Sequence, residues 1–169
     1  MRDADDQQET TRLPKRGKYL KYYLAGFADG EGSFSVSIKR LRTARYGWVI
    51  DPVFQVYQHK DNKCVLEIFR DTLRCGYIRP KSPKSDVLVL IVDNRRWLME
   101  KIIPFFDEYS IISQKREDYE KFREILVRME RKEHHTREGF LKIVKIALTM
   151  NKNGKQRKYK LNDILSGMK

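Results

Sequence analysis

One stretch of the sequence decides the fold: Tyr23-Leu24-Ala25-Gly26-Phe27-Ala28-Asp29-Gly30-Glu31-Gly32-Ser33. Small residues separate large apolar ones in its first half, as at the end of a helix that runs into a strand. Glycine inside a helix costs about 1 kcal/mol relative to alanine, so Gly26 suggests that another element packs closely against this face. Two acids, Asp29 and Glu31, follow between glycines, which let the backbone turn sharply. The stretch therefore predicts a helix over residues 18–29 with a tight packing surface and a carboxylate just beyond its end.

Two segments after this helix alternate between apolar and polar side chains. Residues 33–39 and residues 48–58 each carry apolar residues at every second position, which is typical of half-buried strands. Pro52 lies within the second segment and indicates a sheet edge or a bulge, because proline cannot donate a hydrogen bond to a neighbouring strand.

The remaining elements are predicted from apolar spacing and from turn residues. Expected helices cover residues 61–73, 94–106, 113–131, 136–150 and 161–167, and expected strands cover 76–81 and 86–93. In the last strand, Val87, Val89 and Ile91 are expected to face the core. The order of the first half, αββαββα, indicates an α+β fold with additional C-terminal helices. We expect a flexible tail over residues 1–16, followed by a single domain over 17–169.

The composition favours a polyanionic partner. The chain has 169 residues, 40% of them hydrophobic, and a formal net charge of +13, an excess that most often accompanies nucleic-acid binding. A basic ribosome-associated protein would have the same excess, so charge alone does not indicate an enzyme. No apolar run approaches the roughly 20 residues of a membrane-spanning helix, and the N-terminus has no signal-peptide core, so no membrane partner is expected.

Cysteine and histidine usage gives no sign of a zinc site. Cys64 and Cys75 lie in apolar surroundings without companions at zinc-ligand spacing, and we expect both to be reduced thiols in or near the core. This predicts an intracellular, reducing compartment, whether cytoplasm, organelle or nucleus. His134 and His135 lie in a charged turn and are expected to be solvated.

Residues 24–32 resemble the signature of the LAGLIDADG homing endonucleases. The helix, the glycines, the paired acids and the following strand all agree with that signature. The segments 54–58, 76–79 and 104–106 and the late basic loop also fall where the family has counterparts. The resemblance extends over about residues 18–165.

The resemblance implies a homodimer on DNA. Two signature helices would pack at a two-fold axis through Leu24, Ala25, Gly26 and Phe27, because the chain has one motif and too few residues for a second αββαββα unit. Two saddle-shaped antiparallel sheets would then lie in the DNA major groove. The target would be long and pseudo-palindromic.

The resemblance also implies a metal-dependent active site. Glu31 matches the catalytic acid and would bind Mg²⁺ together with the Gly30 carbonyl; Mn²⁺ would substitute, and Ca²⁺ would bind without supporting cleavage. Gln58 matches a residue that organises water, and Lys115 is our choice for the site lysine among the alternatives in residues 113–116. Asp29 would have a structural role near the helix end. On local sequence alone, the two acids could equally belong to a plain helix-ending turn.

One further feature of the site is left open. Asn62 stands where some members of the family carry a basic residue, and Lys60 or Lys63 could substitute for it. No small organic cofactor is expected.

The predicted DNA contacts are of two kinds. Strand residues expected to read base edges are Ser35, Ser37, Lys39, Asp51, Gln55, Tyr57, Arg79, Lys81 and Asp86. Loop residues expected to contact phosphates are Arg40, Arg42, Arg45, Lys152, Lys155, Arg157 and Lys158. For any one of them, the alternative is an ordinary solvated surface position.

Together these features predict a site-specific endonuclease, encoded in an intron, that makes Mg²⁺-dependent double-strand breaks. The rival hypothesis is a non-catalytic nucleic-acid-binding protein or an intron RNA maturase on the same scaffold. The acid at position 31 favours cleavage, because binding DNA does not require a carboxylate near phosphates. A maturase can retain that acid, so both hypotheses stay open at this point.

Overall fold

The computed structural model describes residues 17–151 and 157–168. The N-terminal residues 1–16, for which we expected a flexible tail, lie outside the described residues. The strands are β1 (Gly32–Arg40), β2 (Trp48–His59), β3 (Tyr77–Pro80) and β4 (Val87–Val92). They form one antiparallel sheet in the order β1-β2-β4-β3. The predicted α+β class is therefore confirmed.

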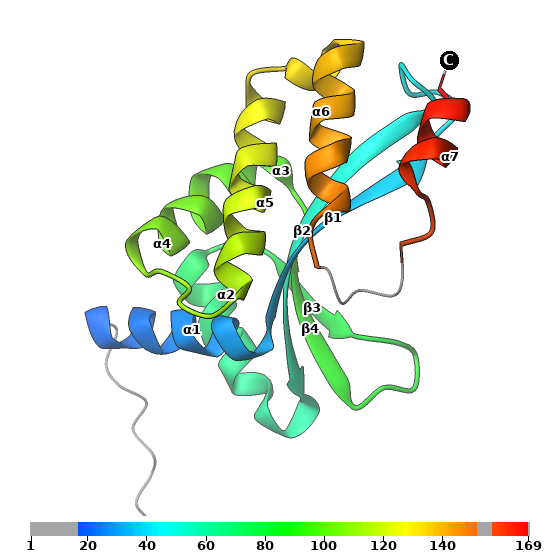
Figure 1. Cartoon of the computed structure of the whole chain (residues 1–169). Helices are drawn as coiled ribbons and strands as arrows, with labels where there is room; N and C mark the ends of the chain where they lie inside the picture. The colour runs from blue at the N-terminus through cyan, green and yellow to red at the C-terminus, as the bar shows by residue number, and fades with distance from the viewer. Residues whose placement is uncertain (1–16, 152–156, 169) are drawn as a thin grey trace, which may run out of the picture.

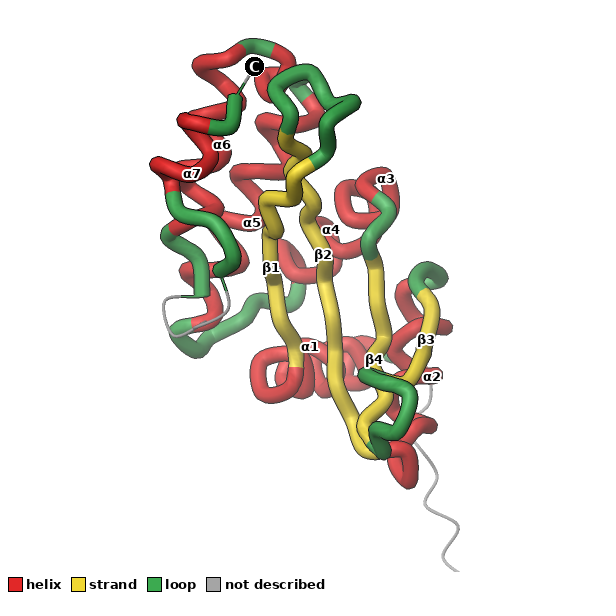
Figure 2. The backbone as a smooth tube through the Cα atoms, turned by 90° about the vertical axis from the view of Figure 1, so that its right-hand side faces the viewer, coloured by secondary structure: helices red, strands yellow, loops and turns green. Residues whose placement is uncertain are grey.

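Helices pack against one face of this sheet (Figures 1 and 2). The longer ones are α1 (Lys18–Glu31), α2 (Lys63–Leu73), α5 (Lys115–Glu130) and α6 (Arg137–Leu148). The shorter ones are η1 (Lys60–Asn62), α3 (Arg95–Trp97), the π-helical turn η2 (Leu98–Ile102), α4 (Ile103–Glu108), η3 (Glu133–His135) and α7 (Leu161–Ser166). None of the helices in these described ranges is long and apolar enough to cross a membrane.

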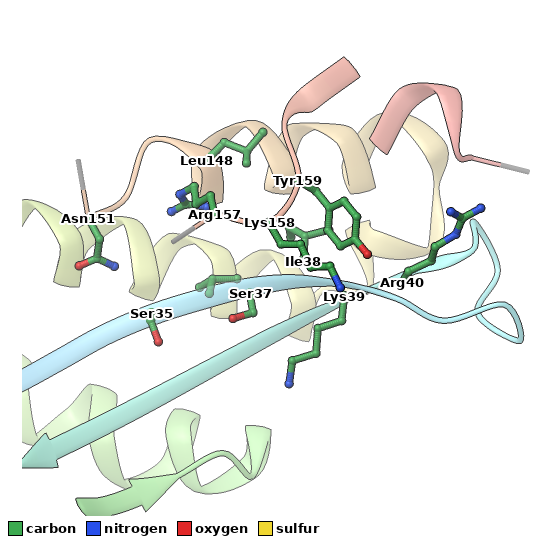
Figure 3. A pocket seen from close by; sticks show the side chains of 11 residues that line it. Ser35, Ser37, Ile38, Lys39, Arg40, Leu148, Asn151, Arg157, Lys158 and Tyr159 are labelled. Carbon is green, nitrogen blue, oxygen red and sulfur yellow. The ribbon is translucent and has the colours of Figure 1, made fainter. Parts of the chain in front are cut away.

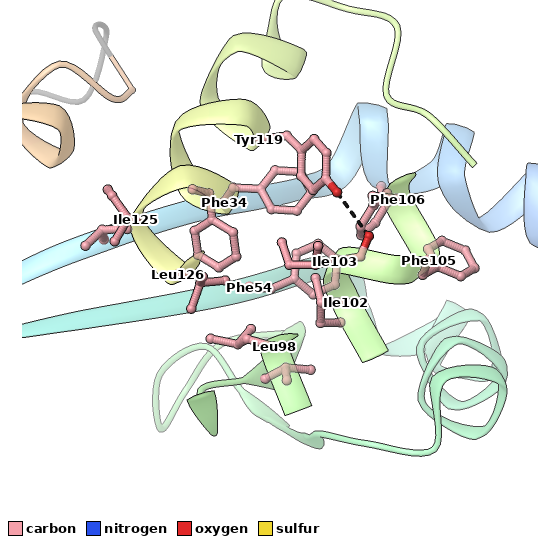
Figure 4. Packing of buried hydrophobic residues seen from close by; sticks show 14 of the residues in the cluster. Phe34, Phe54, Leu98, Ile102, Ile103, Phe105, Phe106, Tyr119, Ile125 and Leu126 are labelled. Carbon is pink, nitrogen blue, oxygen red and sulfur yellow. Dashed lines mark hydrogen bonds between the residues drawn. The ribbon is translucent and has the colours of Figure 1, made fainter. Parts of the chain in front are cut away.

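The core lies between the sheet and the helices and is built around Phe34 (Figure 4). The Phe34 ring lies 5.1 Å from each of the rings of Phe54, Phe106 and Tyr119, measured between centroids. Buried aromatic pairs at such distances add to the stability gained from burial of apolar area. This cluster fixes β1 against α4 and α5, and so fixes the junction where α1 leads into β1.

The inward face of β4 differs from the prediction. Val56 pairs with Leu90 and lies in the core, whereas Gln55 pairs with Ile91 and Tyr57 pairs with Val89. Val87 pairs with His59 in the same alternation. Cross-strand partners share a face of the sheet, so Val87, Val89 and Ile91 all lie on the face opposite the helices, and the core-facing prediction was wrong for all three. The reason is the continuous apolar sequence of this strand, which lacks the alternation that would reveal its orientation.

Smaller differences concern the ends of elements. α1 continues through Glu31 instead of ending at Asp29, so both acids belong to its last turn.

The predicted helix over 94–106 is interrupted by the π-helical turn η2 just before Pro104. Proline has no N–H to donate to the preceding turn, which favours this change of helical register. Pro52 lies where β2 has β1 as its neighbour, since pairing with β4 begins at Phe54.

The turn between β1 and β2 is tied to the helical layer. Arg45 Nη1 and Tyr46 Oη both donate hydrogen bonds to the carbonyl of His135, at 2.6 and 2.8 Å. The predicted phosphate contact of Arg45 is therefore in competition with a bond inside the chain. His135 is exposed as expected. His134 is half-buried, so the expectation that it is solvated was wrong, and its buried Nδ1 has no hydrogen-bond partner among the described residues.

Candidate active site and nucleic-acid interface

The candidate site lies where α1 runs into β1. Gly32 closes the helix by donating its backbone N–H to the Ala28 carbonyl. A side chain on Gly32 would collide with that same carbonyl, so the close approach requires glycine. This junction leaves Glu31 exposed, as the last residue of α1 beside the first residue of the sheet.

The Lys115 side chain contacts the same end of α1. Its Nζ donates to the carbonyls of Ala28, Asp29 and Gly30, at 3.1, 2.6 and 3.1 Å. The last carbonyls of a helix lack partners within the helix and carry partial negative charge, so an ammonium group is stabilised there. Burial lowers the pKa of Lys115, against the opposite effect of the Asp29 and Glu31 carboxylates. The structure thus brings together Glu31, Gly30 and Lys115, three of the predicted site residues.

The Asp29 carboxylate points toward the loop that precedes α5. It accepts hydrogen bonds from the backbone N–H groups of Ile112 and Ser113, at 3.2 and 3.1 Å, and from the Ser113 hydroxyl. Burial raises the pKa of Asp29, but these hydrogen bonds outweigh burial and leave the pKa below its usual value. Sequence reasoning missed this use of Ser113, because 84 residues separate it from Asp29 and no local pattern signals the contact.

Gln58 lies near this junction but is not bonded to it. The residue opposite Gly32 is Val56, so Gln58 is two positions further along β2 from that pairing. Its Oε1 accepts the backbone N–H of His59 at 2.7 Å. Within the described ranges no hydrogen bond joins Gln58 to Glu31, so its place in the site stays a prediction.

The two candidates for the basic residue absent at Asn62 are paired elsewhere. Lys60 forms an ion pair with Asp86 at 2.7 Å, and Lys63 forms one with Glu67 at 2.8 Å. Lys115 is consequently the lysine for which the structure gives a direct contact with the end of α1.

The sheet face opposite the helices carries the predicted base readers of β1, β2 and β3, whereas Asp86 precedes β4 and pairs with Lys60. Ser37 pairs with Asp51, and both Tyr57 and Arg79 pair with Val89, which places these polar side chains on one face. Tyr57 and Asp51 are half-buried, while Ser37 and Arg79 are exposed. A polar, partly exposed sheet face is the kind of surface that a two-stranded ribbon presents in the major groove.

Several readers are paired with one another. Lys39 forms a close ion pair with Asp51, and the Tyr57 hydroxyl donates to Gln55 Oε1 at 2.8 Å. Lys81 Nζ lies 5.5 Å from the centroid of the Tyr57 ring. Burial raises the pKa of Tyr57, and the Arg79 charge lowers it to a lesser extent. These reader side chains therefore form two separate groups, Lys39 with Asp51, and Tyr57 with Gln55 and Lys81.

A cleft of about 540 Å³ runs along the free edge of β1, beside the chain segment 157–159 (Figure 3). Lys39 points away from Tyr159, toward the other side of the sheet. Arg157 donates to the Met150 carbonyl at 2.8 Å, and burial lowers its pKa, against the opposite effect of Asp118. This half-buried guanidinium is therefore partly engaged within the chain.

The other predicted phosphate contacts differ in placement. Arg40 lies over the Trp48 ring, with Cζ 5.8 Å from its centroid, and Lys158 lies 5.5 Å from the centroid of Tyr159. Arg40, Arg42 and Lys158 are exposed. Lys152 and Lys155 lie outside the described residues.

Part of the predicted dimer surface is buried within the chain. Leu24 is 0% exposed and Ala25 is 3% exposed, because both pack into the core of their own chain. Their side chains therefore leave almost no surface for a partner helix, and the interface through residues 24–27 stays a prediction. The exposed face of α1 instead carries Tyr22, Tyr23 and Gly26, while Phe27 is half-buried and stacks against Tyr23 at 6.2 Å.

These features fit a class of basic α+β proteins that act on DNA through a polar sheet. The family model described as LAGLIDADG endonuclease matches residues 24–126. The homing endonuclease I-ApeII of Aeropyrum pernix is 34% identical over 152 residues, which are 86% of this chain and 88% of that protein. DNA endonuclease I-CeuI of Chlamydomonas moewusii is 44% identical over 91 residues; the match covers 54% of this chain and 42% of that protein.

The solved structures agree with the sequence relatives. The archaeal intron-encoded homing endonuclease I-Vdi141I, complexed with DNA, superimposes with a TM-score of 0.79 at 37% identity. That alignment covers 88% of this chain and 94% of the other. The chain therefore belongs to the LAGLIDADG endonuclease family, as its signature predicted.

Proposed function

We propose that this protein is a site-specific homing endonuclease, encoded in an intron, that cuts both strands of a long pseudo-palindromic DNA target as a homodimer with Mg²⁺. The observation that carries the proposal is the end of α1, where exposed Glu31 stands beside the Gly30 carbonyl and the Lys115 ammonium, 3.1 Å from that carbonyl. A DNA-binding surface alone would not need an acid in this position. The family membership and the DNA-bound relative support the substrate class.

The donor set fits a hard divalent cation. Glu31 offers a carboxylate and Gly30 a carbonyl, and Mg²⁺ prefers oxygen ligands, taking few from protein and the rest from water and phosphates. Within the described part of the chain no group of three His, Cys, Asp or Glu side chains could hold a metal. This favours a site shared between protein and DNA. A bound cation supplies an activated water and charge stabilisation for phosphodiester hydrolysis.

The exposed face of α1 supports the homodimer. A Cβ atom added to Gly26 or to Gly30 would meet no other element within 4 Å among the described residues, so packing inside this part of the chain does not require either glycine. Tyr22 and Tyr23 are about half-exposed on the same helix, at 51% and 50%. Glycines spaced by one helical turn allow a second helix to approach closely. An isologous contact through this face would place two Glu31 residues near one axis.

The remaining site residues have distinct proposed roles. Lys115 stabilises negative charge near the scissile phosphate, and Gln58 orients water. The sheet face reads bases, with Arg79 and Lys81 suited to guanine and Gln55 to adenine. Exposed Arg40, Arg42 and Lys158 contact phosphates. The free thiols of Cys64 and Cys75 are compatible with a reducing intracellular compartment.

The proposal is tested by selecting cleaved molecules from a randomised DNA library with Mg²⁺ present, and then assaying Glu31→Gln on the selected site. We expect the variant to lose cleavage and to keep binding measured in Ca²⁺, since it loses the metal-binding charge alone. Glu120→Gln is the matched control, because Glu120 is an exposed acid on α5 paired with Arg116. Binding without cleavage by the wild type would favour the non-catalytic or maturase alternative. Cleavage unchanged by Glu31→Gln would exclude the metal assignment.

A further inference from the structure

The acid that the metal site does not use is held by a dedicated set of donors. Three donors from one loop reach the Asp29 carboxylate: two backbone N–H groups on Oδ2, and the Ser113 hydroxyl on Oδ1. All of them belong to Ile112 and Ser113, in the loop between α4 and α5. A carboxylate engaged in this way has little capacity left for a metal.

These bonds continue into the first turn of α5. The Ser113 hydroxyl, which donates to Asp29, also accepts the backbone N–H of Lys115 at 3.2 Å. The Ser113 carbonyl accepts the backbone N–H of Arg116 at 2.9 Å. Ser113 thus accepts hydrogen bonds from the first two residues of α5, and Asp29 holds Ser113 in place for them.

Lys115, at the start of α5, also forms hydrogen bonds with the end of α1. The Lys115 side chain reaches back to the carbonyls of residues 28, 29 and 30, so Asp29 is bonded through both its carboxylate and its carbonyl. Burial gives the loop little other support at this point, since Ile112 is 86% exposed. The buried neighbour Ile111 holds the loop one residue earlier.

We propose that Asp29 is a positioning residue, whose carboxylate fixes the 112–114 turn and thereby holds the Lys115 ammonium on the end of α1 beside Glu31. The two acids of the signature then have separate tasks: Glu31 faces the reaction, and Asp29 places the lysine. The catalytic consequence rests on the proposed function, but the placement of Lys115 can be measured without it.

The first test measures the reactivity of the Lys115 amine. Wild type, Asp29→Ala and Asp29→Asn are treated with an N-hydroxysuccinimide acetate, and the labelling rate of Lys115 is compared with that of Lys121 by peptide mass spectrometry. We expect Asp29→Ala to label severalfold faster at Lys115 and Asp29→Asn to lie between, because asparagine keeps one accepting oxygen. Asp71→Ala is the control; Asp71 is an exposed acid on α2 bonded to the adjacent Arg70. Unchanged labelling of Lys115 in Asp29→Ala would overturn the proposal.

The second test asks whether Asp29 acts through Lys115. Misplacing a catalytic group by about 1 Å can cost roughly 10²-fold in rate, so we expect Asp29→Ala to slow single-turnover cleavage strongly and to leave DNA affinity nearly unchanged. In a Lys115→Met background the same change should have no further effect on the residual rate. If the rate losses of Asp29→Ala and Lys115→Met multiply in the double variant, Asp29 acts independently of Lys115 and the proposal is overturned.

Folding and function are kept apart by two checks. Ser113→Ala removes the bridging hydroxyl and leaves both backbone donors, so it should show the same changes in smaller measure even if Asp29→Ala folds poorly. If the wild type cleaves no DNA, the proposed function fails, while the labelling result still decides the placement of Lys115. If the wild type cleaves and the labelling does not change, the positioning role alone is refuted.

Discussion

At the residue scale, the two thiols of the chain have opposite surroundings. Cys75 is buried, as predicted, but Cys64 is exposed in the first turn of α2, so its expected place in or near the core was wrong. Cys64 is close in sequence to the buried residues of α2, Leu66, Phe69 and Leu73, but it lies just outside the face of the helix that they form. The sequence alone did not reveal this difference. The reactivity of exposed Cys64 can therefore be compared with that of buried Cys75 in the same chain.

Burial raises the pKa of the Cys75 thiol from 9.0 to about 11, against a smaller opposite effect of Lys101. A raised pKa means that the folded state keeps its proton while the unfolded state loses it, so this stabilisation is present below pH 9 and declines as the pH rises toward about 11. We expect the free energy of unfolding to fall by about 1–2 kcal/mol over that interval.

Urea unfolding at about pH 8 and about pH 10.5 measures this change, and Cys75→Ala should lack it. In the folded protein a thiol reagent should modify Cys64 and spare Cys75. Equal pH dependence in wild type and Cys75→Ala would contradict the prediction.

At the scale of the element, α1 carries apolar residues on two faces, and this explains where sequence reasoning succeeded and failed. The local signature was enough to place Glu31 and Gly30 at a helix end. It could not tell which apolar face meets the core and which meets solvent, so the burial of Leu24 and Ala25 in the core of their own chain was not predicted. The same ambiguity reversed the predicted orientation of β4, because its continuous apolar sequence suits either face of the sheet.

Contacts between elements that are distant in the sequence could be predicted only in part. Lys115 was chosen by resemblance, and the structure places it on the end of α1. Its tether through Ser113 to Asp29 could not be predicted, because the donors include backbone N–H groups, which sequence does not distinguish.

The exposed glycine of α1 gives a prediction about assembly. Gly26→Leu adds a side chain into open space on the single chain but should block close approach of a second helix. We expect the variant to sediment as a monomer at micromolar concentration, with helix content by circular dichroism unchanged. Lys142→Leu is the control, because it adds the same side chain at an exposed site on α6. A wild type that is monomeric without DNA, or a Gly26→Leu variant that stays dimeric, would refute the role of this face.

At the scale of the whole molecule, a formal net charge of +13 on 169 residues predicts strongly salt-dependent DNA binding. Each neutralised phosphate releases counterions, and a protein making several such contacts loses roughly 10³-fold or more in affinity between about 50 and about 200 mM salt. Fluorescence anisotropy with a labelled target, repeated across salt concentrations, measures the slope. Replacing exposed Arg42 with glutamine should reduce the slope by about one contact, whereas the Lys142→Leu control should not. A flat response would contradict the electrostatic footprint.

The pairing of Lys39 with Asp51 and of Tyr57 with Gln55 also constrains how the sheet can evolve. A substitution at one member leaves the other with a changed hydrogen-bonding state, so the two positions are energetically coupled and their effects should be epistatic. Ser37 makes no side-chain hydrogen bond among the described residues, but it lies directly opposite Asp51, so its environment also depends on that pair. On the proposed reading of DNA by this sheet face, adaptation to an altered target should therefore require paired changes at 39 with 51 and at 55 with 57.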